Sequence, residues 1–293
     1  MKLDRIAVFV AAVALTFATQ ADIASATQIS VEEDGKRKIN ISGRQRMLSQ
    51  RMAKAACFAS IGVDRTAHVQ MATKAHEEFG VALVGLREGS AELGLLPENA
   101  PVILTELDAV DDIWAAYGPA VASLLEGETV SSEGMANVAK LSLPTLVQMN
   151  RAVGEFEKRY GGSNIHPSLA LAINVSGRQR MLSQKSSKEF CLIMAGENPD
   201  ANREVLAETI ALFEASLAAL MDGDQTLGLP EAPTDEIYEQ LDKVQVLWTP
   251  MADILKSVAR GSSASDAEIA FVAERNNEVL VEMNKAVGMY ANL

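Results

Sequence analysis

Several residue types are scarce in this 293-residue sequence. Aromatic residues make up 5% of it, and it contains only 19 glycines and 9 prolines. Sandwiches and barrels rely on aromatic and β-branched residues in strands and on glycine and proline in turns, so the composition disfavours both. Apolar residues make up 48% of the chain and charged residues 22%, which is enough to bury a core. An all-α fold is predicted.

The chain also lacks an excess of positive charge and a long apolar run. Its formal net charge is −13, whereas nucleic acid requires a basic surface, so no nucleic-acid partner is predicted. The apolar run over residues 6–18 is shorter than the roughly 20 residues that span a bilayer. Basic residues precede this run and Ala24-Ser25-Ala26 follows it, which predicts a signal peptide over residues 1–26. The mature chain is expected in the periplasm without membrane insertion, and a retained anchor is the alternative.

Histidine and cysteine are rare as well. The three histidines, His68, His76 and His166, have no spacing typical of a metal site, so no metal, no cofactor and no enzymatic activity are predicted. The two cysteines, Cys57 and Cys191, are candidates for a disulfide if the chain is exported to an oxidising compartment.

The most informative feature present is an internal repeat. Residues 39–50, with the sequence Ile-Asn-Ile-Ser-Gly-Arg-Gln-Arg-Met-Leu-Ser-Gln, return at residues 173–184 with Val in place of the second Ile. The same offset relates further pairs: Cys57 with Cys191, Phe79 with Phe213, Trp114 with Trp248, and Met149-Asn150 with Met283-Asn284. The chain is therefore predicted to hold two copies of one unit, over residues 27–160 and 161–293.

Each unit is predicted to form four helices, because apolar residues recur at three- and four-residue spacing between glycine and proline breaks. The expected helices lie near residues 36–60, 64–92, 100–127 and 131–159, and near residues 166–195, 200–222, 233–260 and 264–291. Short connections predict two up-down-up-down bundles. Side-by-side packing would make them a pseudo-symmetric pair with the first helices of the two units parallel. An end-to-end arrangement is the alternative.

The repeated segment resembles the signature of the PilJ-type domain, the periplasmic N-terminal domain of type IV pili methyl-accepting chemotaxis transducers. It is also similar to the P-box of nitrate/nitrite sensor histidine kinases, which has the pattern Gly-x-x-Arg-Met-x-Ser-x-Arg. The matching residues are Gly43, Arg46, Met47, Ser49 and Arg51 in the first copy, and Gly177, Arg180, Met181 and Ser183 in the second, which departs at Lys185. This resemblance implies a four-helix bundle in which the arginine matched by Arg46 and Arg180 binds nitrate or nitrite across a dimer interface.

The helical face that carries Arg46 supports a binding site independently of the resemblance. At about 100° per residue, this face holds mostly small residues, and the face around Arg180 does the same. Small residues let two helices approach closely, so the two arginines are predicted to face each other and to bind a planar oxyanion through paired N–H groups. Secondary candidates for the site are Asn40, Gln50, Asn174 and Gln184. Ion pairs between the arginines and carboxylates are the alternative.

The same helical geometry predicts how the two cysteines lie. Cys57 lies about three turns beyond Arg46 on nearly the same face, and Cys191 has the same relation to Arg180. If the two helices pair in parallel, the cysteines must face each other and a disulfide is predicted. Two separate buried thiols are the alternative.

Together these features predict a soluble periplasmic protein that binds or senses a small anion such as nitrate or nitrite. It would act with a membrane sensor, transducer or transporter. The alternative is a structural helical bundle that docks on an envelope protein and binds no small molecule. Arginines locked to carboxylates, or a large apolar surface patch, would favour this alternative.

Overall fold

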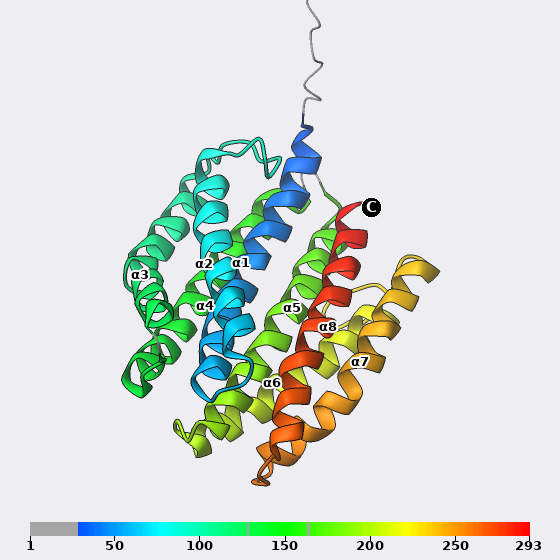
Figure 1. Ribbon diagram of the computed structural model, residues 1–293. Helices are drawn as coiled ribbons and strands as arrows, with labels where there is room; N and C mark the ends of the chain where they lie inside the picture. Colours follow the sequence, from blue (N-terminus) through cyan, green and yellow to red (C-terminus); the bar gives the residue numbers. More distant parts are fainter. Residues whose placement is uncertain (1–28, 128, 163–164) are drawn as a thin grey trace, which may run out of the picture.

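The computed structural model describes residues 29–127, 129–162 and 165–293, and within them it contains eight helices and no strand (Figure 1). The helices are α1 (Val31–Ser60), α2 (Arg65–Glu88), α3 (Pro101–Glu126), α4 (Ser132–Tyr160), α5 (Pro167–Met194), α6 (Pro199–Asp222), α7 (Asp235–Ala259) and α8 (Asp266–Ala291). The predicted all-α class is confirmed. The signal peptide predicted over residues 1–26 lies outside the described residues.

Two helix ends differ from the prediction, and each has a local cause. α1 begins at Val31 rather than near residue 36, because Ser30 and Glu33 form a capping box that satisfies the first backbone amides. α2 ends at Glu88 rather than near residue 92, because Gly89 follows it with φ of 82°, a conformation that glycine adopts without strain. Capping chemistry therefore sets these boundaries more closely than apolar periodicity.

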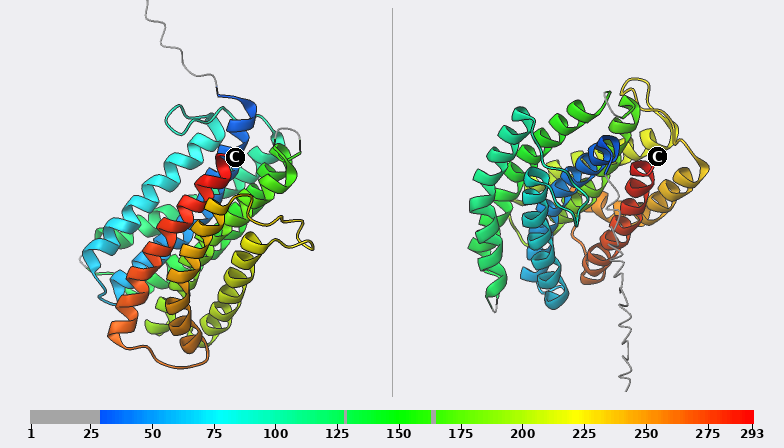
Figure 2. Two further views of the ribbon diagram at one scale, coloured as in Figure 1. Left: turned by 90° about the vertical axis from the view of Figure 1, so that its right-hand side faces the viewer. Right: turned by 90° about the horizontal axis from the view of Figure 1, so that it is seen from above.

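α1 and α5 lie side by side and parallel at the centre of the molecule (Figures 1 and 2). α2 and α4 pack on α1, and α3 completes that bundle, while α6, α7 and α8 build the equivalent bundle around α5. α1 begins at the end of the molecule where α8 finishes (Figure 1). The predicted side-by-side pseudo-symmetric pair is confirmed, and the end-to-end arrangement is excluded.

A disulfide joins the two central helices. Cys57 of α1 and Cys191 of α5 are bonded, with their Cα atoms 6.1 Å apart, and both are fully buried. The predicted disulfide is confirmed, and the alternative of two separate thiols is wrong. The bond ties the two copies together at the far end of α1 and α5.

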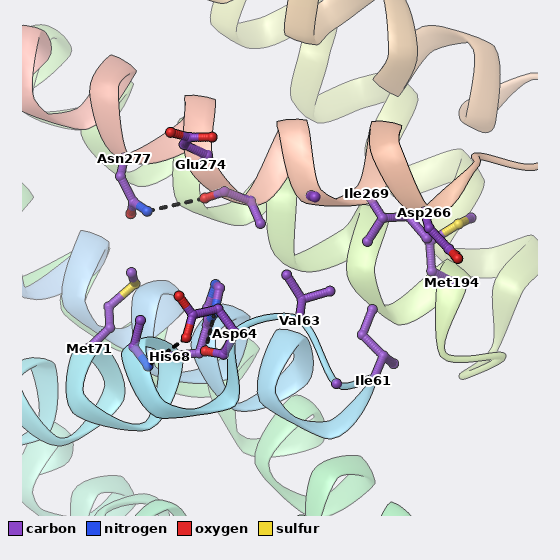
Figure 3. A pocket seen from close by; sticks show the side chains of 14 residues that line it. Ile61, Val63, Asp64, His68, Met71, Met194, Asp266, Ile269, Glu274 and Asn277 are labelled. Carbon is purple, nitrogen blue, oxygen red and sulfur yellow. Dashed lines mark hydrogen bonds between the residues drawn. The ribbon is translucent and has the colours of Figure 1, made fainter.

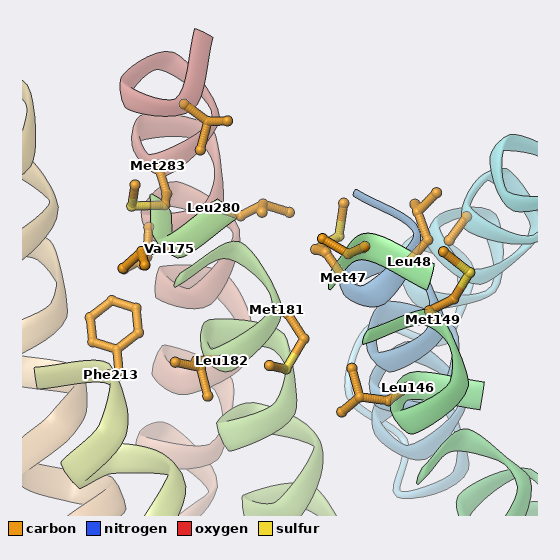
Figure 4. Close-up of a cluster of buried hydrophobic side chains, with 14 of the residues drawn as sticks. Met47, Leu48, Leu146, Met149, Val175, Met181, Leu182, Phe213, Leu280 and Met283 are labelled. Carbon is orange, nitrogen blue, oxygen red and sulfur yellow. The ribbon is translucent and has the colours of Figure 1, made fainter. Parts of the chain in front are cut away.

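The large apolar side chains of the central helices point into the two bundles (Figure 4). Met47 and Leu48 of α1 pack with Met149 of α4, and Leu182 of α5 packs on the equivalent side in the second bundle. The two copies also share a stacked aromatic pair. The ring centroids are 4.3 Å apart for Phe79 and Trp114 and 3.8 Å apart for Phe213 and Trp248. Because the large apolar groups point outward into the two bundles, α1 and α5 present small and polar residues to each other.

Candidate functional site

The surface where α1 meets α5, called here the central seam, is lined by small buried residues. Gly43 and Gly177 stand at equivalent positions in it. Nη2 of Arg46 and Nη2 of Arg180 both lie within 4 Å of where a Cβ of either glycine would stand. Arg46 and Arg180 are therefore close neighbours across the seam, as predicted. The two glycines leave the space that the guanidinium groups occupy.

Arg46 is held entirely by neutral oxygens. Its side chain is 0% exposed, and Nη1 donates to Oδ1 of Asn150 at 2.8 Å. Nη2 donates to Oδ1 of Asn174 at 2.7 Å and to the carbonyl oxygen of Asn174 at 3.2 Å. The Asn150 contact comes from α4 of the same copy, whereas Asn174 belongs to α5 of the other copy.

Arg180 has two of the three equivalent contacts. It is 3% exposed, its Nη1 donates to Oδ1 of Asn284 at 3.4 Å, and its Nη2 donates to the carbonyl oxygen of Asn40 at 3.0 Å. Asn284 follows Met283 on α8 as Asn150 follows Met149 on α4. Each arginine is thus bound by one asparagine of its own copy and one of the other copy, which makes the site a product of both halves.

The arginine pair, Arg46 with Arg180, carries two buried charges without an ion-pair partner among the described residues. Burial lowers the pKa of Arg46 to about 9, and the charges of Arg178 and Arg180 add to this lowering. Burial also lowers the pKa of Arg180 to about 9, with a further contribution from Arg44. The Nε atoms of both members of the pair are buried and have no hydrogen-bond partner. Ion pairs with carboxylates, the alternative considered for these arginines, are not formed in the described structure.

One carboxylate lies near the pair and makes it asymmetric. Asn174 donates through Nδ2 to Oε2 of Glu157, and the charge of Glu157 acts to raise the pKa of Arg46. Ala291 stands at the equivalent position of the second copy. The negative charge therefore orients Asn174 toward Arg46, while Arg180 has no such second layer.

Two buried lysines form a second polar layer nearer the disulfide, and sequence reasoning missed them. Lys54 donates to Oδ1 of Asn276 at 2.9 Å, and its equivalent Lys188 donates to Oε1 of Gln50 at 2.8 Å. Burial lowers the pKa of Lys54 well below its usual value and that of Lys188 to about 8. The shared offset of Lys54 and Lys188 was a signal that could have pointed to them.

The secondary candidates divide into two groups. Asn174 and Asn40 contact the arginine pair, Asn40 only through its backbone carbonyl. Gln50 and Gln184 lie in the lysine layer, where their Nε2 atoms donate to the carbonyl oxygen of Ser142 and to Oδ1 of Asn276. The ligand-binding role of all four, and of the arginines, stays a prediction. Asn150 and Asn284 contact the arginines but were not predicted, although the repeated Met-Asn dipeptide was a visible signal.

A side cavity of about 460 Å³ reaches the arginine pair between α1, α2 and α8. Arg180, Asn40 and Asn284 line it, and Arg44 and Arg51 contribute positive charge to its wall. This cavity connects solvent with one member of the pair.

A larger hollow of about 930 Å³ lies between the α1–α2 turn and the start of α8 (Figure 3). Ile61, Val63 and Ile269 give it apolar walls, while Asp64 and Glu274 give it negative charge. This chemistry repels anions, so we place the candidate anion site at the arginine pair rather than here.

The described part of the chain offers neither a metal site nor a membrane-spanning helix. No group of three or more His, Cys, Asp or Glu side chains is arranged to hold a metal ion in those residues. None of the eight described helices combines the length and the apolarity that crossing a bilayer requires.

Comparison with known proteins assigns the tandem bundle to a class and a family. Residues 28–138 and 166–270, which together make up well over half of the chain, match the family "Type IV pili methyl-accepting chemotaxis transducer N-term". The fold and the repeated signature are thus those of a chemoreceptor-type sensory domain. The chain belongs to this PilJ family, and it contains the domain twice.

A curated relative supports the same class. The methyl-accepting chemotaxis protein McpN of Pseudomonas aeruginosa is 33% identical to the chain over 117 residues. The match covers 40% of this chain and 21% of McpN, so the chain matches about a fifth of the length of that relative. The activities of the whole relative are outside this comparison.

Proposed function

We propose that this protein is a periplasmic sensory module that binds a small oxyanion of the nitrate or nitrite type between Arg46 and Arg180. The observation that carries the proposal is the pair of buried guanidinium groups that face each other without an ion-pair partner in the described structure. In this proposal, the copies over residues 27–160 and 161–293 act together as one binding unit, and residues 1–26 direct the chain to the periplasm.

Electrostatics explains why an anion should bind at this place. Two like charges about 7 Å apart at an effective dielectric constant near 20 repel each other by roughly 2 kcal/mol. An anion between Arg46 and Arg180 would replace that repulsion with attraction and with charge-assisted hydrogen bonds. A planar oxyanion suits two guanidinium groups, because each can donate two nearly parallel N–H bonds.

The neighbouring amides suit the same ligand. Asn150 and Asn174 now accept the hydrogen bonds of Arg46. A rotation of either amide would free a guanidinium N–H for the anion and offer its own N–H₂ as a donor. Binding would then draw α1 and α5 together around the ligand, because the two arginines belong to different helices. We propose that a membrane sensor, transducer or transporter detects this small helix movement.

Calorimetric titration and thermal unfolding test the proposal. At a ligand concentration of 100 times Kd, mass action should stabilise the protein by about 2.7 kcal/mol. Nitrate or nitrite should therefore raise the melting temperature, and Arg46→Ala or Arg180→Ala should abolish the increase. Arg203→Ala is the control, because Arg203 lies on α6 in an ion pair with Asp200.

Sulfate and phosphate serve as comparison anions in the same titrations. A planar site should bind them more weakly than nitrate, because their oxygens are arranged tetrahedrally. If the unmutated protein shows no shift and no heat with any of the four anions at millimolar concentration, the proposal is wrong. The structural-bundle alternative would then account for the protein better.

A further inference from the structure

The side cavity offers a route to the arginine pair, and it exists on the α2–α8 side of the molecule. The residues around it are contributed by α1, α2 and α8, and Arg180 of α5 forms its inner end. Arg180 and Arg44 line this cavity, whereas Arg46 and Arg178 do not. Access to the pair through this opening is therefore access to Arg180.

The wall of the cavity carries an arginine, Arg44, whose charge is not paired with a carboxylate of the described residues. Arg44 is half-buried, its Nε is buried without a partner, and it forms no hydrogen bond or ion pair in the described structure. Arg51 donates to the amide oxygens of Gln184 and Asn277, at 3.3 Å in each case. The one carboxylate in the wall belongs to Glu78 on α2. Without a strong carboxylate partner, Arg44 can bind an anion that enters.

The equivalent positions on the side of the second copy carry larger side chains. Lys185, the equivalent of Arg51, pairs with Glu189 and donates to Oγ1 of Thr209 at 2.7 Å. The positions of Glu189 and Thr209 are occupied in the first copy by Ala55 and Ala75, which have only a methyl group. An ion pair and its hydrogen bond thus stand on one side where the other side has two alanines, of which Ala75 lines the cavity.

Two further positions near the cavity differ between the copies. Asn277 and Glu78 of the open side are replaced by Leu143 and Leu212 at the equivalent positions of the other side. At these two positions the route on the α2–α8 side is polar and the equivalent route is apolar. The two sides of the arginine pair therefore differ in the residues around the side cavity.

We propose that anions reach the arginine pair from the α2–α8 side only, and that Arg44 captures them in the side cavity before Arg180 binds them. The identity of the captured ligand as a nitrate-type oxyanion rests on the proposed function. The one-sided access does not rest on it, because it follows from the shape and lining of the cavity.

Chemical modification tests the access without any anion. Phenylglyoxal reacts with guanidinium groups, and peptide mass spectrometry measures its reaction with each arginine. Arg180 should react at least about fivefold faster than Arg46. Val281→Trp should slow the reaction of Arg180 about fivefold, because Val281 lines the cavity and is 51% exposed. Val147→Trp is the matched control, since Val147 is the equivalent residue of α4 and is 46% exposed.

Equal modification rates for Arg46 and Arg180, or equal slowing of Arg180 by the two tryptophan variants, would overturn the one-sided route. Both substitutions are at exposed positions, so the fold should tolerate them, and circular dichroism checks this.

A second measurement tests the capture role of Arg44. In calorimetric titrations with nitrate, Arg44→Gln should weaken binding about tenfold at low salt, and less at high salt, where the charge is screened. Arg178→Gln, the equivalent change on the closed side, should weaken it less than about twofold. Equal losses in the two variants would overturn the capture role. If the unmutated protein does not bind nitrate, the proposed function fails, while the modification rates still decide the access.

Discussion

At the residue scale, the buried cations of this protein fall into two kinds. Four of them, Arg46, Lys54, Arg180 and Lys188, lie in the central seam and are hydrogen-bonded to neutral oxygens. Lys38 lies outside the seam and is instead bound by carboxylates. Burying a charge is costly unless an opposite charge accompanies it. The four seam cations without a carboxylate partner are therefore suited to an anionic ligand, whereas Lys38 with its carboxylates stabilises the fold.

The carboxylate cluster around Lys38 makes stability depend on pH. Nζ of Lys38 lies 3.1 Å from Glu98 and 3.1 Å from Asp34, and the hydroxyl of Tyr160 donates to Glu98 at 2.7 Å. Burial acts to raise the pKa of Glu98, but hydrogen bonds from Tyr160, the Ala100 amide and Lys38 outweigh it and hold the pKa below its usual value. The stabilisation by Glu98 is therefore present above its unfolded pKa of about 4.5 and is lost as the pH falls through the lower folded pKa.

Glu98→Gln should lower the free energy of unfolding at pH 7 by about 3 kcal/mol, the lower end for breaking a buried pair, because Asp34 still pairs with Lys38. The variant should also lose part of the decline in stability between pH 5 and pH 3 that the unmutated protein shows. Urea unfolding at several pH values measures both effects. Glu274→Gln, at an exposed position of α8, is the control. An unchanged pH profile in Glu98→Gln would contradict the assignment.

At the element scale, α1 and α5 each contain a glycine that disfavours the helix but allows the two helices to pack closely. Gly43 and Gly177 stand inside these helices, where glycine costs about 0.5–1 kcal/mol relative to alanine. A Cβ at Gly43 would lie 3.3 Å from Nη2 of Arg46 and 3.6 Å from Nη2 of Arg180. The glycines therefore serve the arginine pair rather than the helix.

Gly43→Ala should separate stability from binding. The gain in helix propensity offsets the crowding, so the free energy of unfolding should change by less than about 1 kcal/mol. Nitrate binding should weaken about tenfold, because the added methyl group displaces the guanidinium groups. Gly80→Ala on α2, where a Cβ would have open space, should stabilise the helix without changing binding. Calorimetric titration and urea unfolding of both variants measure this, and unchanged nitrate affinity in Gly43→Ala would count against a ligand between the arginines.

At the scale of the whole molecule, one chain forms the pseudo-symmetric pair that two chains would otherwise have to form. The disulfide between Cys57 and Cys191 keeps the two bundles in this pairing, and the large core clusters on either side hold α1 and α5 in place. Pairing within one chain allows the two halves to differ, as they do around the side cavity.

Removing the disulfide should destabilise the pair without unfolding the bundles. A bond that closes a loop of 134 residues stabilises the fold by about 4–5 kcal/mol on the chain-entropy model. Cys57→Ser with Cys191→Ser should lose a large part of this and should bind nitrate more weakly, because α1 and α5 can then separate. Urea unfolding and calorimetric titration check the two effects. Two free thiols in the denatured, unreduced protein would show that the bond does not form.

The helices, their repeat, the arginine pair and its neighbours Asn40 and Asn174 could be predicted from the sequence, whereas Asn150, Asn284 and the buried lysines were missed. Apolar spacing and turn residues act locally, so they place α2 through α8 to within a few residues. The repeat of the signature around Arg46 and Arg180 then implies that like faces meet. Asn150 and Asn284 come from helices that contact the pair only in the folded bundle, so the repeated Met-Asn dipeptide by itself did not show that they bind the arginines.

The sequence by itself determined the all-α class and the two copies, because both follow from periodicity and from one repeated offset. It predicted parallel central helices and a bond between the cysteines beside an end-to-end arrangement and two separate thiols, and the tertiary structure decided between them. Tertiary structure alone decided which charges lack partners and which side of the arginine pair is open. Those features depend on side chains from several helices, such as Ala75, Thr209 and Glu189. Contacts between residues distant in the chain are set by packing, which local sequence patterns do not contain.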